Sequence, residues 1–183
     1  MRAYWEALGH FVHEFAHVEK MLFSILQRTA QVSMPVARAI FHGARSDGAR
    51  QFINRMLEVT EPNPAIAEDF KFIFAQLAHI TDARNSLLHY GTEFNEGTDF
   101  LSTNRFIALT KERVKNIPMS VEILNQMTAD LDKISAHLLV HLVRGWADEV
   151  IVMVGDKLQA SWRYTPPSQA SRGGKTPNIP PAQ

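Results

Sequence analysis

The chain has 183 residues, 45% of them hydrophobic, which is enough apolar material for one domain with its own core. It contains no cysteine, so a disulfide framework, a thiolate zinc site and a thiol nucleophile are excluded. Nineteen basic and nineteen acidic residues give a formal net charge of zero. This balance argues against a protein that coats nucleic acid by bulk charge, but it allows a local site built from a few arginines.

The composition predicts a cytoplasmic protein. No segment reaches the roughly 18 consecutive apolar residues that a membrane span requires. The N-terminal region carries Glu6, His10 and Glu14 where a secretory signal peptide has an uncharged apolar run. We therefore expect no association with membranes.

The first half of the chain is predicted to be helical. Its first thirty residues lack proline and repeat apolar side chains at steps of three and four, which predicts one long amphipathic helix. Glu19 fills the one gap in this stripe and is predicted to face inward. A short helix is expected over residues 36–41, and a third helix is expected to open at Ser46. The predicted core stripe of the first helix consists of Trp5, Leu8, Val12, Phe15, Leu22 and Leu26, widened by Phe11, Val18 and Ile25.

The second half contains the strongest helical signal, from Ala65 to about Tyr90, with Gly91 at the position of a C-terminal cap. Residues 92–118 alternate short apolar groups with turn residues, which predicts a β-hairpin. A last long helix is predicted to follow the capping residue Ser120. The expected fold is all-α, a bundle of four to five helices with a small β-hairpin inserted between the last two long helices.

Three parts of the chain differ in composition. Residues 1–145 are predicted to form the helical domain. Residues 146–164 form a C-terminal extension in which residues 150–154 fit either a strand or a helix. Residues 165–183 are rich in proline, serine and glycine and are expected to be disordered.

One arginine on the predicted helix 65–90 stands where an apolar side chain is expected. Arg84 continues the seam between Ile80 and Leu87, near the middle of the apolar arc. A guanidinium stays charged and is costly to bury unpaired. It therefore needs a carboxylate, for which Glu19 is the obvious candidate, a carbonyl, or an anion that enters a cleft. All three alternatives are open at the level of the sequence.

Two further polar residues share one edge of the same arc. Asn85 and His89 lie four residues apart, so they are neighbours on a helix surface. The pattern Arg84-Asn85-x-x-x-His89, at the end of a long helix in a small all-α domain, resembles the motif of the HEPN superfamily. The order of elements over about residues 5–145 is similar as well, and residues 36–59 resemble the middle helices of bacterial HEPN-like proteins.

The resemblance implies a homodimer and, in the ribonuclease members of the superfamily, RNA cleavage without a metal or other cofactor. It implies catalytic roles for Arg84, Asn85 and His89, with support from Glu19, Asp82 and Tyr90. It also implies RNA as the substrate, a role in defence or stress response, and an antitoxin or regulatory protein as a possible partner. HEPN toxins tend to carry a tyrosine two residues after the histidine, whereas here Tyr90 follows His89 directly and Gly91 takes that place.

The chemistry of such a site explains the residue types. Attack of an RNA 2′-hydroxyl on the neighbouring phosphate requires a base, an acid and cations that stabilise the transition state. Histidine suits both proton transfers and arginine suits the phosphoryl oxygens. Because one chain supplies one motif histidine, two copies around a two-fold axis are expected to form one site. DNA is excluded as a substrate because it lacks the attacking hydroxyl. The alternative is a non-catalytic module that binds RNA, a nucleotide or a protein partner through the same groove.

A second motif, His13-Glu14-x-x-His17, matches the zinc-protease pattern. On the predicted first helix these histidines lie opposite the apolar stripe, and no third ligand stands out. We therefore predict a solvated face and no catalytic metal, with an adventitious surface metal as the alternative. His137 and His141 also lie four residues apart, on the last long helix, and no function is assigned to them.

Overall fold

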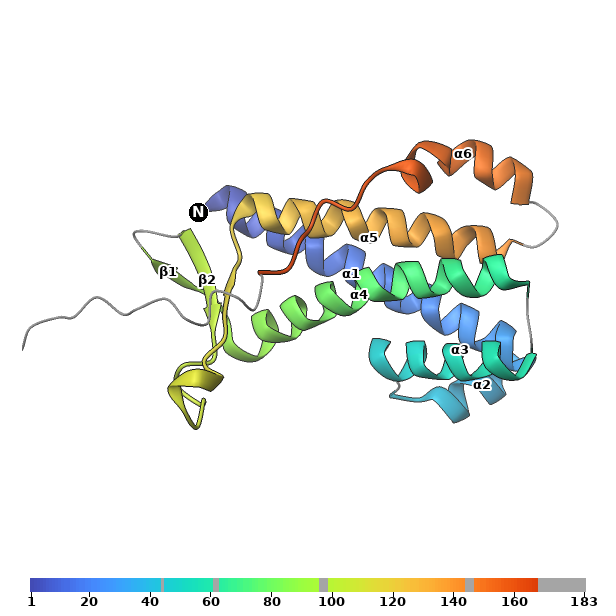
Figure 1. Cartoon of the computed structure of the whole chain (residues 1–183), viewed down its shortest axis with the longest axis horizontal. Helices are drawn as coiled ribbons and strands as arrows, with labels where there is room; N and C mark the ends of the chain where they lie inside the picture. The colour runs from blue at the N-terminus through green and yellow to red at the C-terminus, as the bar shows by residue number, and fades with distance from the viewer. Residues whose placement is uncertain (44, 61–62, 96–98, 144–146, 168–183) are drawn as a thin grey trace, which may run out of the picture.

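The computed structural model describes residues 1–167, except residues 44, 61–62, 96–98 and 144–146. Within this part the chain is mostly helical, with a small antiparallel sheet at one end (Figure 1). The helices are α1 (Arg2–Ala30), α2 (Met34–Phe41), α3 (Ser46–Thr60), α4 (Pro64–Tyr90), α5 (Val121–Leu142) and α6 (Ala147–Gln159). The mainly helical fold expected from the sequence is confirmed, with one helix more than the bundle of four to five.

The core lies between three long helices. α1 packs along α5, α4 crosses both, and α2 and α3 cover the far end of α1 (Figure 1). Each fully buried leucine, isoleucine or phenylalanine contributes about 1.5–3 kcal/mol. The largest fully buried side chains of α1, α4 and α5 are Tyr4, Phe11, Phe15, Leu22, Leu26, Ile73, Leu77, Ile80, Leu124 and Met127.

The predicted core stripe of α1 is wrong at two positions. Trp5 is 58% exposed and Val12 is 43% exposed, whereas Tyr4 and Phe11 are buried. In the first half of α1 the buried face, which includes Tyr4, Ala7 and Phe11, is therefore rotated by about one residue relative to the prediction. An exposed apolar strip therefore remains along the first half of α1.

The helix ends follow the capping signals of the sequence. The Asn63 side chain accepts a hydrogen bond from the Ala65 amide at 3.0 Å, and the Ser120 hydroxyl accepts one from the Ile123 amide at 3.2 Å. α4 ends at Gly91, whose φ of 67° suits a residue without a side chain. These caps fix both ends of the helix that carries Arg84.

The region between α4 and α5 forms three strands instead of a two-stranded hairpin. β1 (Glu93–Asn95), β2 (Asp99–Thr103) and β3 (Asn116–Pro118) form an antiparallel sheet in the order β1-β2-β3. Phe94 pairs with Phe100, and Ser102 pairs with Ile117. The hairpin prediction missed β3 because three residues that end in a proline carry no alternating pattern.

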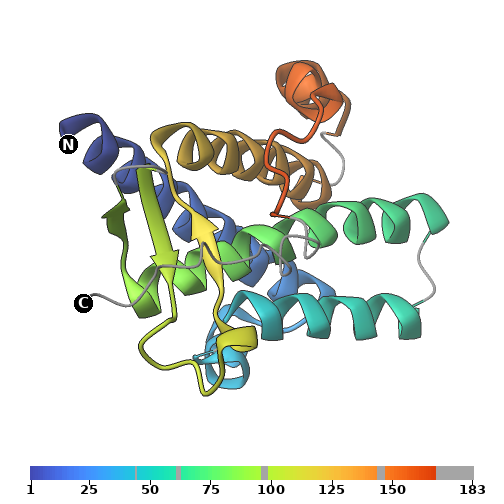
Figure 2. The same cartoon turned by 60° about the vertical axis from the view of Figure 1, so that its left-hand side comes forward.

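The C-terminal extension is ordered as far as the structure describes it. The ambiguous run at residues 150–154 lies in α6, which packs on α5. Residues 160–167, called the strap below, then run back in extended form across α5 toward α4 (Figure 2). Most of the tail predicted to be disordered, residues 168–183, lies outside the described residues. In the described part of the chain, no helix is both long and apolar enough to cross a membrane.

Candidate functional site

Arg84 is half-buried on α4 and is not tied to an acid. Its Cζ atom lies 5.0 Å from the centroid of the Phe15 ring on α1, and its Nη1 donates a hydrogen bond to Asn85 Oδ1 at 3.2 Å. Within the described residues, no carboxylate oxygen lies within 4.0 Å of the guanidinium. The Glu19 side chain, also half-buried, forms no ion pair with it. Of the three alternatives drawn from the sequence, the structure does not contain the Arg84–Glu19 pair, and the amide carbonyl oxygen of Asn85 is the acceptor that it shows for the guanidinium.

His89 lies apart from Arg84 within one chain. Five residues on an α-helix correspond to a rotation of about 140° between the two side chains. His89 is exposed in the last turn of α4, and its ring centroid lies 6.2 Å from that of Tyr90. Across the described residues it has no hydrogen bond to Asn85. One chain therefore brings Arg84 and Asn85 together and leaves His89 separate.

The surroundings of Arg84 are apolar and partly open. A hydrogen bond of 2.9 Å between Tyr4 Oη and Thr92 Oγ1 holds the start of α1 beside the end of α4. The exposed Val12 lies one turn before Phe15 on α1, and the exposed Leu88 lies one turn after Arg84 on α4. The two helices that bring Phe15 and Arg84 together thus also carry solvent-exposed apolar side chains one turn away.

The two other residues predicted to support the site do not contact Arg84. Asp82 is exposed, and Tyr90 is 39% exposed. Asp82 instead affects the strap: burial, together with the charge of Asp82, raises the pKa of Tyr164 to about 12. The strap therefore reaches the helix that carries the motif.

The histidines of the zinc-protease pattern face solvent, as predicted. His10, His13 and His17 are exposed on α1. Glu14 lies between His10, at 3.7 Å, and His17, at 3.9 Å. Among the described side chains, no group of three or more His, Cys, Asp or Glu is arranged to hold a metal ion.

A cluster of three titratable residues joins α4 to α5. Asp69 accepts a contact of 2.7 Å from His137 Nδ1 on one oxygen and one of 2.7 Å from His141 Nε2 on the other. Burial alone would raise the pKa of Asp69, but the hydrogen bonds and charges of the two histidines hold it well below its usual range. Nε2 of His137 is buried and has no hydrogen-bond partner among the described residues. The spacing of the histidines was visible in the sequence, whereas nothing marked Asp69 as their partner.

The strap is held by a buried carboxylate. Asp130 is 1% exposed and accepts hydrogen bonds from the amides of Arg163, at 2.8 Å, and Tyr164, at 2.9 Å. Gln76 Nε2 donates to the same carboxylate at 2.7 Å and to the Tyr164 carbonyl at 2.8 Å. Lys133 contacts the Ala160 carbonyl and lies 4.4 Å from the Trp162 ring. Neither Asp130 nor Gln76 was predicted as a structural polar residue.

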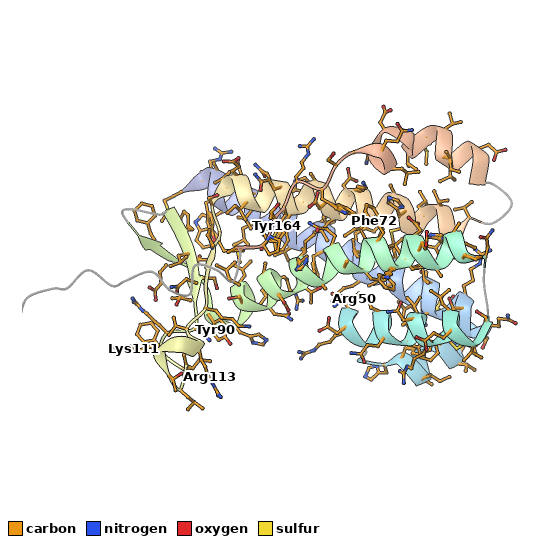
Figure 3. The ribbon with its side chains drawn as sticks, viewed as in Figure 1. Arg50, Phe72, Tyr90, Lys111, Arg113 and Tyr164 are labelled. Atoms are coloured by element: carbon orange, nitrogen blue, oxygen red, sulfur yellow. The ribbon has the colours of Figure 1, made fainter. Side chains whose placement is uncertain are left out.

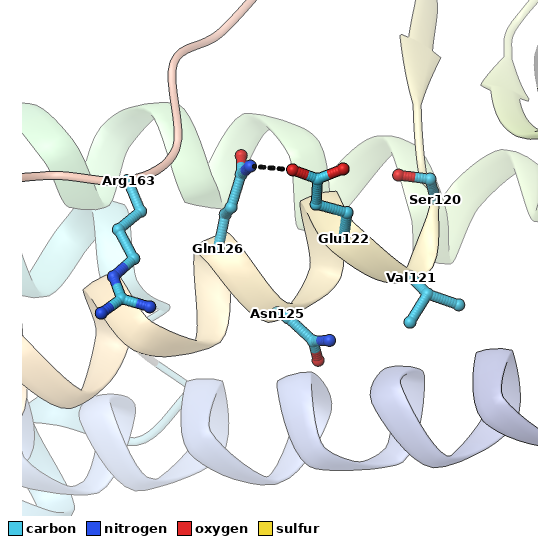
Figure 4. A pocket seen from close by; sticks show the side chains of 6 residues that line it. All are labelled: Ser120, Val121, Glu122, Asn125, Gln126 and Arg163. Atoms are coloured by element: carbon cyan, nitrogen blue, oxygen red, sulfur yellow. Dashed lines mark hydrogen bonds between the residues drawn. The ribbon is translucent and has the colours of Figure 1, made fainter.

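Three cavities lie away from the motif. The first, about 850 Å³, is an open polar groove at the start of α5, where Gln126 bonds to Glu122 at 3.2 Å and Arg163 of the strap lines one side (Figure 4). The second, about 630 Å³, lies between α3 and α4 and includes Arg50. The third, about 450 Å³, lies between α4 and Trp162 of the strap. Arg84, Asn85 and His89 line none of these three.

In comparisons with known proteins, no protein-family model, curated protein or solved structure matches the chain.

Proposed function

We propose that the chain is a homodimeric, metal-independent endoribonuclease with a HEPN-like fold and a composite site built from Arg84, Asn85 and His89 of two copies. The observation that supports this proposal is the half-buried Arg84, which lies against Phe15 and has no carboxylate partner among the described residues. A charge in such a place is expected to bind an anion, and a phosphodiester fits the planar donor geometry of arginine.

A second copy explains two further features. Trp5 and Val12 are exposed on α1, the helix that carries Phe15, as apolar side chains at a protein–protein interface are before assembly. Because Arg84 and His89 point in different directions within one chain, a two-fold axis is needed to place an arginine opposite a histidine. Two arginines also offset the partial negative charge at the end of α4, which disfavours phosphate.

The chemistry follows from these groups. One imidazole removes the proton of the RNA 2′-hydroxyl, which attacks the adjacent phosphorus, and the other imidazole protonates the departing 5′ oxygen. The guanidinium groups stabilise the charge on the phosphoryl oxygens, and Asn85 keeps its neighbouring guanidinium in place. The products are a 2′,3′-cyclic phosphate and a 5′-hydroxyl.

A non-catalytic module is the second candidate. It is favoured by the separation of His89 from Arg84 and Asn85 in one chain, since a binding site needs only the cation. Such a module binds RNA, a nucleotide or a protein partner through Arg84 and cleaves nothing.

The test is RNA cleavage by the purified chain, with Arg84→Ala and His89→Ala compared against Arg55→Ala and His13→Ala, which remove exposed residues of the same types. We expect the first pair to reduce cleavage at least a hundredfold, on the order of the effect of losing a transition-state donor or a general acid–base. The control pair and a chelator should have no effect, and an RNA with 2′-deoxy sugars should not be cleaved. Binding without cleavage in the unaltered chain would favour the module, and cleavage that survives both motif variants or requires a metal would reject the ribonuclease.

A further inference from the structure

The connection between β2 and β3, residues 104–115, is held together by its own hydrogen bonds, and we call it the basic loop. Asn104 closes its base: its Oδ1 accepts from the Lys115 amide at 2.6 Å, and its Nδ2 donates to the Arg113 carbonyl at 3.2 Å. The Asn104 carbonyl accepts from the amides of Ile107 and Ala108, each at 3.0 Å. A 3₁₀ turn, Lys111–Arg113, completes the loop. The side chains that project from it are therefore carried on a fixed backbone.

The basic loop concentrates positive charge in a chain whose net charge is zero. Four basic residues and one acidic residue, Glu112, give its twelve residues a net charge of +3. Arg105 is paired with Glu93 at 2.9 Å. Lys111, Arg113 and Lys115 are exposed, and no carboxylate of a described side chain lies within 4.0 Å of them. Three exposed cations on one loop attract a polyanion.

The same loop exposes apolar side chains. Phe106 is 79% exposed and Leu109 is 84% exposed, and Ile107 between them is exposed as well. The Arg105 guanidinium lies 4.6 Å from the centroid of the Phe106 ring, so its pairing leaves the opposite ring face open. A flat aromatic surface next to unpaired cations is the combination that binds single-stranded nucleic acid, through base stacking and phosphate contacts.

The basic loop lies at the same end of the molecule as the motif. Ser102 of β2 contacts Ser86 of α4 through their hydroxyls at 3.0 Å, two residues before the loop begins and two residues after Arg84. Figure 3 shows Lys111 and Arg113 at the end of the molecule where Tyr90, the last residue of α4, also lies. The basic loop and Arg84 therefore lie at one end of the molecule.

We infer that the basic loop binds single-stranded RNA and delivers it to the motif, with Lys111, Arg113 and Lys115 on the phosphates and Phe106 stacked on a base. This inference rests on the proposed function, and it names the element that holds the substrate. An anionic lipid surface would also attract cations beside an apolar tip. RNA is favoured because Arg84, a second unpaired cation site, lies at the same end, and one extended polyanion engages both.

The experiment separates binding from cleavage. Full-length protein with His89→Ala, which removes the proposed proton carrier, is titrated with a fluorescent mixed-sequence single-stranded RNA at several salt concentrations, and binding is followed by anisotropy. In this background we compare the loop variant Lys111→Gln/Arg113→Gln/Lys115→Gln with a control variant, Lys20→Gln/Arg38→Gln/Arg55→Gln. The control removes three exposed cations from α1, α2 and α3 and changes the net charge equally.

We expect the loop variant to bind the RNA at least tenfold more weakly than the unaltered loop at about 0.1 M salt. The plot of log K against log salt should also become less steep by about 2, or roughly 0.7 for each lost phosphate contact. Phe106→Ala should weaken binding about tenfold without changing this slope, because stacking involves no counterion release. The control variant should keep both the affinity and the slope.

Equal weakening in the control variant, or unchanged binding in the loop variant, would overturn the inference. If the loop variant lost binding to phosphatidylserine vesicles but bound RNA as before, the inference would be overturned in favour of a lipid surface. Loop-dependent RNA binding by a protein that cleaves no RNA would reject the ribonuclease and keep the loop as an RNA-binding element, whereas Arg84-dependent cleavage with loop-independent binding would reject this inference alone.

Discussion

Tyr164 carries its phenol group into the core at the end of the strap. It is buried, and burial together with the nearby Asp82 raises its pKa to about 12 (the residue is labelled in Figure 3). The unfolded chain has a tyrosine pKa of about 10, so the folded state holds this proton more tightly. Stability that depends on Tyr164 is therefore complete below about pH 10 and is lost as the pH rises toward 12.

A tyrosine-to-phenylalanine pair tests this dependence. Tyr164→Phe removes the buried ionisable group, so the alkaline loss of unfolding free energy should shrink by about 2 kcal/mol between pH 10 and 12. Tyr90→Phe removes an exposed phenol and should leave the alkaline loss as it is. Denaturant unfolding at a series of pH values measures both. Equal alkaline slopes in the unaltered chain and Tyr164→Phe would contradict the burial.

Asp69 is expected to make the stability of the fold depend on pH at the acid end of the scale. Its pKa is held below its usual range by His137 and His141, despite the opposing effect of burial. The stability it contributes is therefore present above about pH 4, the pKa of an unfolded aspartate, and is lost as the pH falls through the folded value. Asp69→Asn should lower stability at neutral pH by about 2 kcal/mol and flatten the acid limb of the stability curve.

The matched control for Asp69 is Asp132→Asn, which weakens an exposed ion pair with Lys157. Its effect should stay below about 1 kcal/mol, as for other surface pairs. If both substitutions change stability by the same amount, then the two histidines do not hold Asp69 in the way that the distances indicate.

At the scale of elements, the helices could be predicted from sequence, but the hydrogen bonds between polar side chains and distant parts of the chain could not. The periodicity of α4 and the caps at Asn63 and Ser120 are local, so their signals lie within a few neighbouring residues. The strap is different, because Asp130 meets the backbone of Arg163 more than thirty residues later. No spacing rule connects such positions.

The candidate site also has a part that could be predicted from sequence and a part that could not. Arg84 was found because it interrupts an apolar seam within one helix, and its half-buried position agrees with that prediction. Its neighbours across the helices were not found: Phe15 was expected to face the core, but its contact with the guanidinium was not predicted. Trp5 and Val12 were assigned to the core because periodicity gives the width of an apolar arc more reliably than it gives the edge of the packed face.

The strap yields a prediction at this scale. Asp130→Ala removes the acceptor of two strap amides and of Gln76, which leaves those donors buried and should destabilise the strap by about 3 kcal/mol or more. Trypsin should then cut after Arg163 much faster than in the unaltered chain, since the strap detaches more often.

Asp156→Ala, an exposed change on α6, should leave the rate of that cut unchanged. An unchanged rate in Asp130→Ala as well would mean that the strap is held by its side chains alone and does not need the carboxylate.

At the scale of the whole molecule, the proposed site depends on a second copy of the chain. One chain supplies a half-buried cation, an exposed histidine at the end of the same helix, and an exposed apolar strip at Trp5 and Val12. None of these alone makes a ribonuclease, whereas two copies joined along the strip would provide two cations and two imidazoles for one phosphate.

The most direct test changes the strip and follows both mass and activity. Val12→Glu places a charge on the proposed interface of α1, whereas Val152→Glu makes the same change on α6, where the valine is 85% exposed. Light scattering gives the molecular mass, and RNA cleavage is measured on the same samples. We predict a dimer that cleaves RNA for the unaltered chain and for Val152→Glu, and an inactive monomer for Val12→Glu. A Val12→Glu protein that cleaves RNA as a monomer, or an unaltered chain that is monomeric and fully active, would contradict the composite site.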